Sequence, residues 1–112
     1  PETEIQKEIL EYLKLRGIFC WRNNAGLVIK GRVIHMSPSG SPAIIGVMPD
    51  GRFLGIEVKQ PRKNLSDKQA EFFAKLRDNK AYCFVAHSTT EVEWHLARYR
   101  PWVDKLTSGG SR

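Results

Sequence analysis

The sequence lacks several features that would assign a protein to a class at once. No apolar run approaches the roughly 18 residues that a membrane span needs, and the polar start is not a signal peptide, so we expect no membrane partner. Cys20 and Cys83 are too few and too far apart for a disulfide framework or a zinc knuckle, and we expect two reduced, buried thiols. There is no glycine-rich phosphate loop, and no metal-ligand spacing links the histidines, which we interpret as structural or surface residues: His35, His87 and His95.

Length and charge narrow the possibilities further. With 112 residues, of which 41% are hydrophobic, the chain can bury one core but not two. The 18 Lys and Arg residues against 12 Asp and Glu give a net charge of +6, which favours a polyanionic partner, most simply nucleic acid. The polar residues 107–112 are typical of a frayed tail, so we place the domain at residues 1–106.

Hydrophobic periodicity and turn residues predict an α/β domain, a mixed sheet with helices packed on it. The loop at 37–42 is indicated by its Ser, Pro and Gly content. The expected helices are 4–16, 66–79 and 88–99, and the expected strands are 18–21, a short hairpin within 27–35, 43–48, 52–59 and 81–86.

The hairpin formed by residues 43–59 carries the most information. Pro49-Asp50-Gly51 has the composition of a three-residue hairpin loop, and this loop fixes the pairing of the two strands. The resulting register places Ala43 directly opposite Glu57, with both side chains on one face of the sheet. Lys59 lies two residues beyond Glu57 and therefore shares that face.

A glutamate and a lysine inside an apolar strand require an explanation, because buried carboxylates are usually paired or bound to metal. One explanation is a catalytic site: Glu57 and the backbone carbonyl of Val58 could ligate Mg²⁺ or Mn²⁺, and Lys59 could orient a water. Such a metal would neutralise charge and supply a nucleophile in phosphodiester cleavage. The other explanation is an outward-facing pair on an edge strand, and the strand pattern alone does not decide between them.

Five segments occur in an order that is informative as a set: Glu4-Ile5-Gln6, Trp21–Gly26, Ser41–Gly46, Ile56–Pro61 and Leu65–Gln69. Together they resemble the core of a PD-(D/E)xK nuclease and, more narrowly, a virus-type replication–repair nuclease (VRR-NUC) domain in its small stand-alone form. The resemblance implies a restriction-endonuclease-like fold and a metal-dependent, structure-selective DNA endonuclease similar to Holliday junction resolvases. It also implies Mg²⁺ or Mn²⁺ as cofactor, branched DNA as substrate, a homodimer and, for a phage or prophage gene, the cytoplasm of a bacterial host.

One position departs from the family pattern. The family has Gly-x-Pro-Asp where this chain has Gly40-Ser41-Pro42-Ala43, so the metal-binding aspartate is missing. Asp50 cannot replace it, because it lies at the hairpin tip, about 20 Å from Glu57 along an extended strand. Ala43 is either a deliberate Asp→Ala substitution or a natural loss, and the intact Glu57 and Lys59 favour the former. In both cases we expect the chain to be inactive or severely impaired.

The resemblance also implies further site residues. Glu4 matches the acidic residue on the first helix of the family, with Glu8 one turn later as the alternative. Gln69 matches a residue near the metal, but Ser66-x-x-Gln69 is also a helix capping box, and the two roles are compatible.

A last group of residues concerns DNA. Arg22 and Asn23 match a Trp-Arg-x-Asn segment of the family, whereas Trp21 is expected in the core. Basic residues in the loops before and after the hairpin could contact phosphates, which would position DNA by shape rather than by sequence. Two other hypotheses remain open, a non-catalytic nucleic-acid-binding module and a protein-interaction subunit. The basic residues are Lys30, Arg32, Arg62, Lys63 and Lys68.

Overall fold

The chain opens with helix α1 (Glu2–Leu15), which begins two residues before the expected start. The computed structural model describes residues 1–23 and 26–99. Ile9 and Leu13 recur at helical spacing and are fully buried, so this face of the helix packs on the core. The helix ends in a Schellman motif, in which Gly17 adopts a φ of 77° and the Ile18 amide donates to the Leu13 carbonyl at 3.0 Å.

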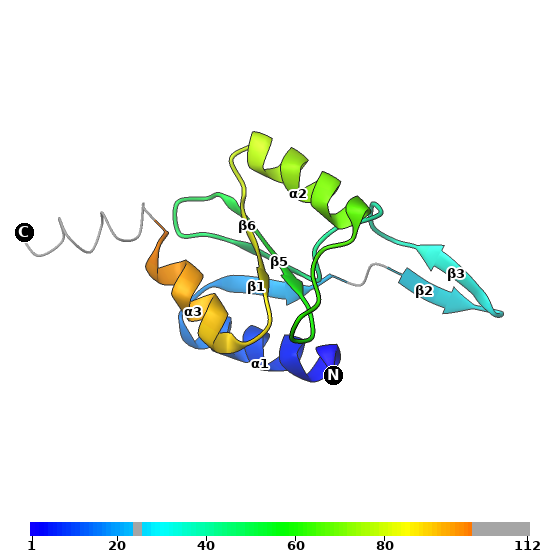
Figure 1. Cartoon of the computed structure of the whole chain (residues 1–112), viewed down its shortest axis with the longest axis horizontal. Coiled ribbons are helices and arrows are strands. Elements are labelled where there is room, and N and C mark those ends of the chain that lie inside the picture. Colours follow the sequence, from blue (N-terminus) through cyan, green and yellow to red (C-terminus); the bar gives the residue numbers. More distant parts are fainter. Residues whose placement is uncertain (24–25, 100–112) are drawn as a thin grey trace, which may run out of the picture.

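Four strands form a mixed sheet in the order β1-β4-β5-β6. The pairs β1–β4 and β4–β5 are antiparallel, whereas β5 and β6 run parallel, as a crossover through α2 requires. Helices α1 and α3 cover one face of the sheet and α2 lies on the other (Figure 1). The expected α/β architecture is therefore confirmed. The strands are β1 (Phe19–Arg22), β4 (Ile44–Val47), β5 (Phe53–Val58) and β6 (Tyr82–Ala86), and the helices are α2 (Asp67–Asp78) and α3 (Thr89–Ala97).

The central hairpin has the register that its turn predicts. Ile44 pairs with Ile56, and the Met48 amide donates to the Arg52 carbonyl at 2.8 Å to close the loop. Asp50 Oδ1 accepts the Arg52 amide at 3.2 Å, which is the hydrogen bond of an Asx turn. Asp50 is thus a turn residue, and the strand end that carries Glu57 lies at the opposite end of the hairpin.

The two remaining helices begin at side-chain caps. Ser66 accepts the Gln69 amide at 3.3 Å, and the Gln69 side chain accepts the Ser66 amide at 2.9 Å, so the predicted capping box is confirmed. Ser88 caps α3 by accepting the amide of Glu91. These caps fix the first turn of each helix, so α2 begins directly after the loop that follows β5.

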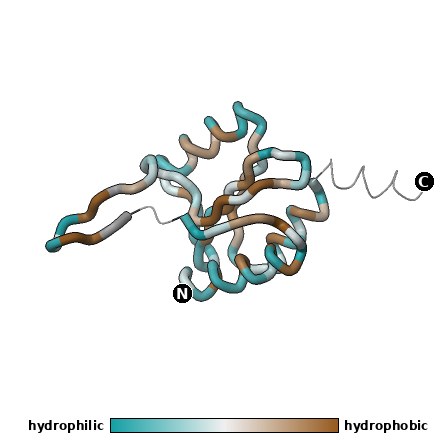
Figure 2. The backbone as a smooth tube through the Cα atoms, turned by 180° about the vertical axis from the view of Figure 1, so that it is seen from behind, coloured by the Kyte–Doolittle hydropathy of each residue, from teal (hydrophilic) through white to brown (hydrophobic). Residues whose placement is uncertain are grey.

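Strands β2 (Gly26–Ile29) and β3 (Arg32–His35) form the expected short hairpin, which is a separate two-stranded sheet. It projects away from the four-stranded sheet and its helices (Figure 1). Both of its strands are hydrophobic and its tip is hydrophilic (Figure 2). The tip residues Lys30 and Gly31 both have positive φ, as a two-residue hairpin turn requires.

One core prediction is right and one is wrong. Cys20 and Cys83 are free, buried thiols, as expected. Trp21 is not a core residue: its exposed fraction is 43%. Because Cys20 faces the core, strand alternation turns Trp21 to the opposite face of the sheet.

Two further predictions concern membranes and the tail. No helix among the described residues is long and apolar enough to cross a membrane. The tail expected at 107–112 lies outside the described residues.

Candidate active site

Glu57 is a buried charged residue at the centre of the sheet. Its strand, β5, lies between β4 and β6, and its side chain is only 6% exposed. The alternative of an outward-facing pair on an edge strand is therefore wrong. Burying a carboxylate costs free energy unless other groups compensate, so this position calls for a function.

The environment of Glu57 favours its neutral form. Burial, together with a smaller effect of the charge of Glu2, raises the pKa of this carboxyl from 4.5 to about 7. The charge of Lys59 and a backbone hydrogen bond from Ala43 act in the opposite direction but do not offset burial. Glu57 is therefore poised to change its protonation state near neutral pH.

Residue 43 is in contact with this carboxylate. The paired register from Ile44↔Ile56 continues to Ala43 and Glu57, and the amide of Ala43 donates to the Glu57 side chain. The expected juxtaposition is thus confirmed. The methyl group of Ala43 adds no oxygen, so the second carboxylate of the family pattern is missing here.

The acidic residues of α1 differ in their relation to Glu57. Glu2, which no sequence signal indicates, is partly buried and its charge acts on Glu57. Glu4 and Glu8 are exposed. The earlier start of the helix explains why the sequence did not indicate Glu2: Pro1 is the N-cap residue and its side chain forms no capping hydrogen bond.

Asn23 organises the loop that leads into residue 43. Its side-chain nitrogen donates to Ser41 Oγ and to the Pro42 carbonyl, both at 2.9 Å, and its oxygen accepts Ser37 Oγ at 2.8 Å. Its backbone amide also donates to the Ala43 carbonyl at 2.8 Å. Asn23 therefore holds residue 43 in place beside Glu57, and its amide group is fully engaged within the protein.

The start of α2 packs against the same loop. Gly40 has a φ of 86°, and a Cβ there would lie 2.4 Å from the Lys68 carbonyl oxygen, so only glycine fits. This contact brings the first turn of α2 next to the residues preceding Ala43. Gln69 uses its side-chain oxygen in the capping box.

His87 joins the loop after β5 to α3. Its Nδ1 lies 2.8 Å from Glu91 Oε1 and its Nε2 lies 2.8 Å from the Lys63 carbonyl. Both partners accept hydrogen bonds, so the doubly protonated ring fits this position best, and the hydrogen bonds to Lys63 and Glu91 raise the pKa of His87. This clamp fixes the loop close to Lys59, whose amide donates to the Ala86 carbonyl at 3.1 Å.

The predicted DNA-contacting cations fall into two groups instead of one cluster. Arg62, Lys63 and Lys68 are exposed around the start of α2, beside the loop that precedes residue 43. Lys30 and Arg32 lie at the tip of the projecting hairpin, because β2 and β3 pair only with each other. The exposed Arg22 ends β1 next to Asn23.

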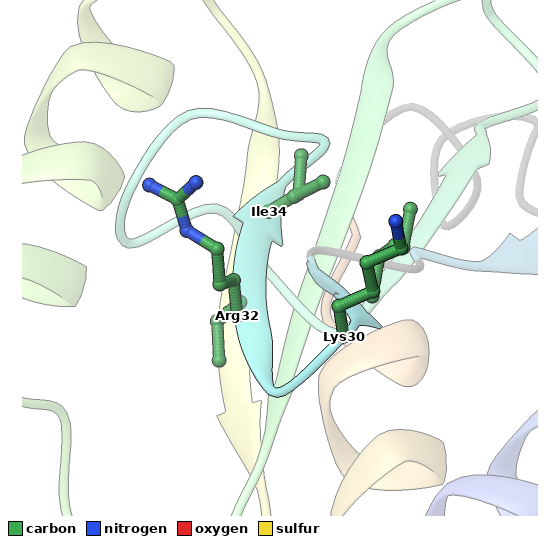
Figure 3. A pocket seen from close by; sticks show the side chains of 5 residues that line it. Lys30, Arg32 and Ile34 are labelled. Atoms are coloured by element: carbon green, nitrogen blue, oxygen red, sulfur yellow. The ribbon is translucent and has the colours of Figure 1, made fainter.

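A hollow of about 400 Å³ is found on the β2–β3 hairpin. It is lined by side chains of Ile29–Lys30 and Arg32–Ile34, and Lys30 and Arg32 extend to different sides of the ribbon (Figure 3). It contains no carboxylate or thiol that could perform chemistry. The hollow is thus separate from the site around Glu57.

The described residues do not make up a complete metal site. They contain no group of three His, Cys, Asp or Glu side chains that could hold an ion. Glu57 and the Val58 carbonyl provide two oxygen donors but only one carboxylate, and the second carboxylate of the family pattern is replaced by the methyl group of Ala43. The sequence with Ala43 therefore does not fit the metal that the family pattern implies.

Comparisons with known proteins identify the fold and the family. The chain is similar to a solved structure described as a VRR_NUC domain, with 23% sequence identity and a TM-score of 0.65 over 88% of this chain and 96% of that one, which shows a common fold. No curated protein is similar enough to count as a match. The family model for the VRR-NUC domain matches residues 1–90. VRR-NUC domains are generally divalent-metal-dependent nucleases, and this chain belongs to the VRR-NUC family.

Proposed function

We propose that this domain is the DNA-binding and DNA-cleaving unit of a structure-selective, metal-dependent endonuclease of the Holliday-junction-resolvase type, and that Ala43 makes the present chain inactive. The observation that carries the proposal is the contact between Ala43 and the buried Glu57. An aspartate at position 43 would add a second carboxylate to a site that already has one.

The other groups around Glu57 have roles in this proposal. Glu57, the Val58 carbonyl and an aspartate at position 43 would hold Mg²⁺ or Mn²⁺. Lys59 would orient the attacking water, and Glu2 is the acidic residue of α1 that supports the site, in preference to Glu4 and Glu8.

The proposed substrate is branched DNA. The residues proposed to contact its phosphates are exposed, and the described residues include no helix-turn-helix or zinc finger that would read base edges. A junction with two-fold symmetry suits two copies of the domain, so we propose a homodimer. The phosphate-contacting residues are Arg22, Lys30, Arg32, Arg62, Lys63 and Lys68.

The test is Ala43→Asp, assayed on a four-way junction and a plain duplex with Mg²⁺ or Mn²⁺. We expect the Ala43→Asp variant to cleave the junction and the parent chain not to cleave it. Adding Glu57→Gln to Ala43→Asp should lower the cleavage rate about 100-fold or more, because a catalytic metal contributes several kcal/mol. Ala43→Asn is the matched control, since it has the same shape without the charge. Equal cleavage by the parent chain and Ala43→Asp would contradict the assignment.

Metal binding gives a second readout that does not depend on cleavage. Two close carboxylates repel each other, so Ala43→Asp is expected to lower the thermal midpoint without metal and to regain it with Mn²⁺. The parent chain should not respond to Mn²⁺.

The loss of the aspartate also favours a second function, a non-catalytic DNA-binding module on a nuclease fold. This function predicts that Ala43→Asp binds DNA as the parent does and gains neither cleavage nor stabilisation by metal.

A further inference from the structure

Four exposed apolar side chains form a surface on the α2 side of the sheet, which we call the aromatic shelf. Phe19 is 71% exposed and Trp21 is 43% exposed, although both are large aromatic residues on a strand. Their rings lie 5.4 Å apart at an angle of 53°. Val47 and Phe53, 40% and 37% exposed, complete the shelf across β4 and β5.

The shelf is exposed because α2 covers only one half of this face. Helix α2 packs on strands β5 and β6. Cys83 Sγ on β6 contacts the Phe73 carbonyl of α2, and Leu76 of α2 lies close to Gly55 on β5. Strand β1 is at the edge of the sheet, away from α2 (Figure 1). No described helix therefore covers Phe19 and Trp21.

The shelf continues directly from the site around Glu57. Along β1, Trp21 precedes Asn23 by two residues and therefore points to the same face, about 7 Å further along the strand. Asn23 is bonded to Ala43, and Ala43 to Glu57. Trp21 pairs with Ile45, and Ile45 with Gly55, so Trp21 lies about 10 Å across the sheet and about 7 Å along it from Glu57, on the same face. A strand of DNA whose phosphate lies at Glu57 could therefore extend over the shelf.

The charge of the surrounding segment indicates what the shelf binds. Residues 12–49, which include β1 and β4, contain no Asp or Glu, so neither strand places a carboxylate on the shelf that would repel a phosphate. Arg22, at the end of β1, is the cation nearest to Trp21 in this strand. DNA offers bases for the aromatic rings and phosphates for such cations.

We propose that Phe19 and Trp21 stack an unpaired base of the DNA strand that leads away from the scissile phosphate. This inference rests on the proposed function, because it deepens the description of the same site. Stacking needs a base that is free of its partner strand, so the shelf would distinguish branched or gapped DNA from a continuous duplex.

The test uses the parent chain, without added metal, and compares a plain duplex with the same duplex carrying a single-stranded gap. Loss of one base–aromatic stack lowers affinity about 5- to 100-fold, so we expect Trp21→Ala and Phe19→Ala to weaken binding to the gapped DNA by that factor. Binding to the duplex should change less than about twofold, and Trp21→Phe should restore most of the affinity.

Two controls separate stacking from other effects. Trp94→Ala removes a tryptophan that is 53% exposed on α3, on the opposite face of the sheet, and should leave both affinities unchanged. With Trp94 and Trp102 replaced by phenylalanine, Trp21 is the remaining fluorophore, and gapped DNA should quench it more than duplex does.

Three outcomes would overturn the proposal. These are unchanged binding of gapped DNA, equal losses on gapped and paired DNA, and a shift from dimer to monomer in sedimentation without a change in DNA affinity. The last would assign the shelf to contact between copies. The shelf test measures DNA binding by the parent chain and does not require cleavage. A failure of Ala43→Asp to cut DNA would therefore refute the nuclease proposal, whereas the binding measurement would still decide whether the shelf stacks a base.

Discussion

A carboxyl group that is buried although its burial lowers the stability of the fold indicates selection for function. Glu57 could be replaced by an apolar residue at the same position without losing any described ion pair, since the groups that act on it are the charge of Lys59, the Ala43 amide and the charge of Glu2. Groups with strongly shifted pKa values concentrate at functional sites for this reason. The single residue Glu57 therefore carries more functional information than the net charge of the chain.

The shifted pKa of Glu57 predicts how stability depends on pH. The folded state holds its proton until about pH 7, whereas the unfolded state releases it near 4.5, so stability falls as pH rises through this interval. Glu57→Gln should remove the penalty and raise the free energy of unfolding at about pH 8 by about 1–3 kcal/mol, with little effect at about pH 4. Urea unfolding at both pH values measures this. The exposed Glu4→Gln is the control, and an equal gain at both pH values would contradict the argument.

Residues differ in how well the sequence predicts them, for physical reasons. The pairing of Ala43 with Glu57 follows from the turn at 49–51, because a hairpin loop fixes its register locally. Glu2 is not predictable in this way, since no capping signal marks where α1 begins. The exposure of Trp21 depends on how far α2 extends over the sheet, and no local pattern contains that information.

At the scale of elements, residue 43 is positioned by packing between a loop and a helix. The loop at 37–42 is held from one side by Asn23 and from the other by the first turn of α2, where Gly40 touches the backbone of Lys68. Pro42 is fully buried, and a Cβ on Gly55 would lie 2.9 Å from its ring. The geometry of the site thus depends on α2, although α2 supplies no carboxylate to it.

Two glycines with similar backbone angles test this contact. Gly40→Ala places a methyl group against the Lys68 carbonyl in addition to the strain of positive φ, so we expect it to destabilise the fold by about 2–4 kcal/mol. Gly31 has a φ of 76°, and a Cβ there would have no atom within 4 Å. Gly31→Ala should therefore lower the free energy of unfolding by only about 1 kcal/mol. Thermal unfolding of the two variants gives the comparison. Equal losses would mean that Gly40 serves only its turn and that α2 does not brace the loop.

Elements were more predictable than their arrangement. Periodicity, caps and turn residues located the described helices and strands, including the short hairpin within 27–35, to within about two residues, because these signals are local. That the β2–β3 hairpin stays separate from the main sheet and projects away from it is a tertiary result, which no local pattern contains. The division of the cations into two groups follows from this detached hairpin.

At the scale of the whole molecule, the cations proposed to contact phosphates lie in two separate regions. One is the start of α2, beside the loop that precedes residue 43, and the other is the tip of the hairpin, which projects from the rest of the fold (Figure 1). A duplex arm that enters the site and continues past the hairpin would meet both regions. Such binding uses phosphates, which are present in any sequence, and fits recognition by DNA shape.

This arrangement predicts a steep dependence of DNA binding on salt. Each neutralised phosphate contributes about 0.9 to the slope of log affinity against log salt, so the six proposed contacts should lower affinity by about three orders of magnitude between about 50 and 200 mM salt. Lys30→Gln with Arg32→Gln should reduce the slope by about 2, whereas Lys75→Gln with Lys80→Gln, at the far end of α2, should not change it. Fluorescence anisotropy over a salt series measures the slopes. If the hairpin variant kept the parent slope, the hairpin would not touch DNA, and only the region beside Glu57 would bind it.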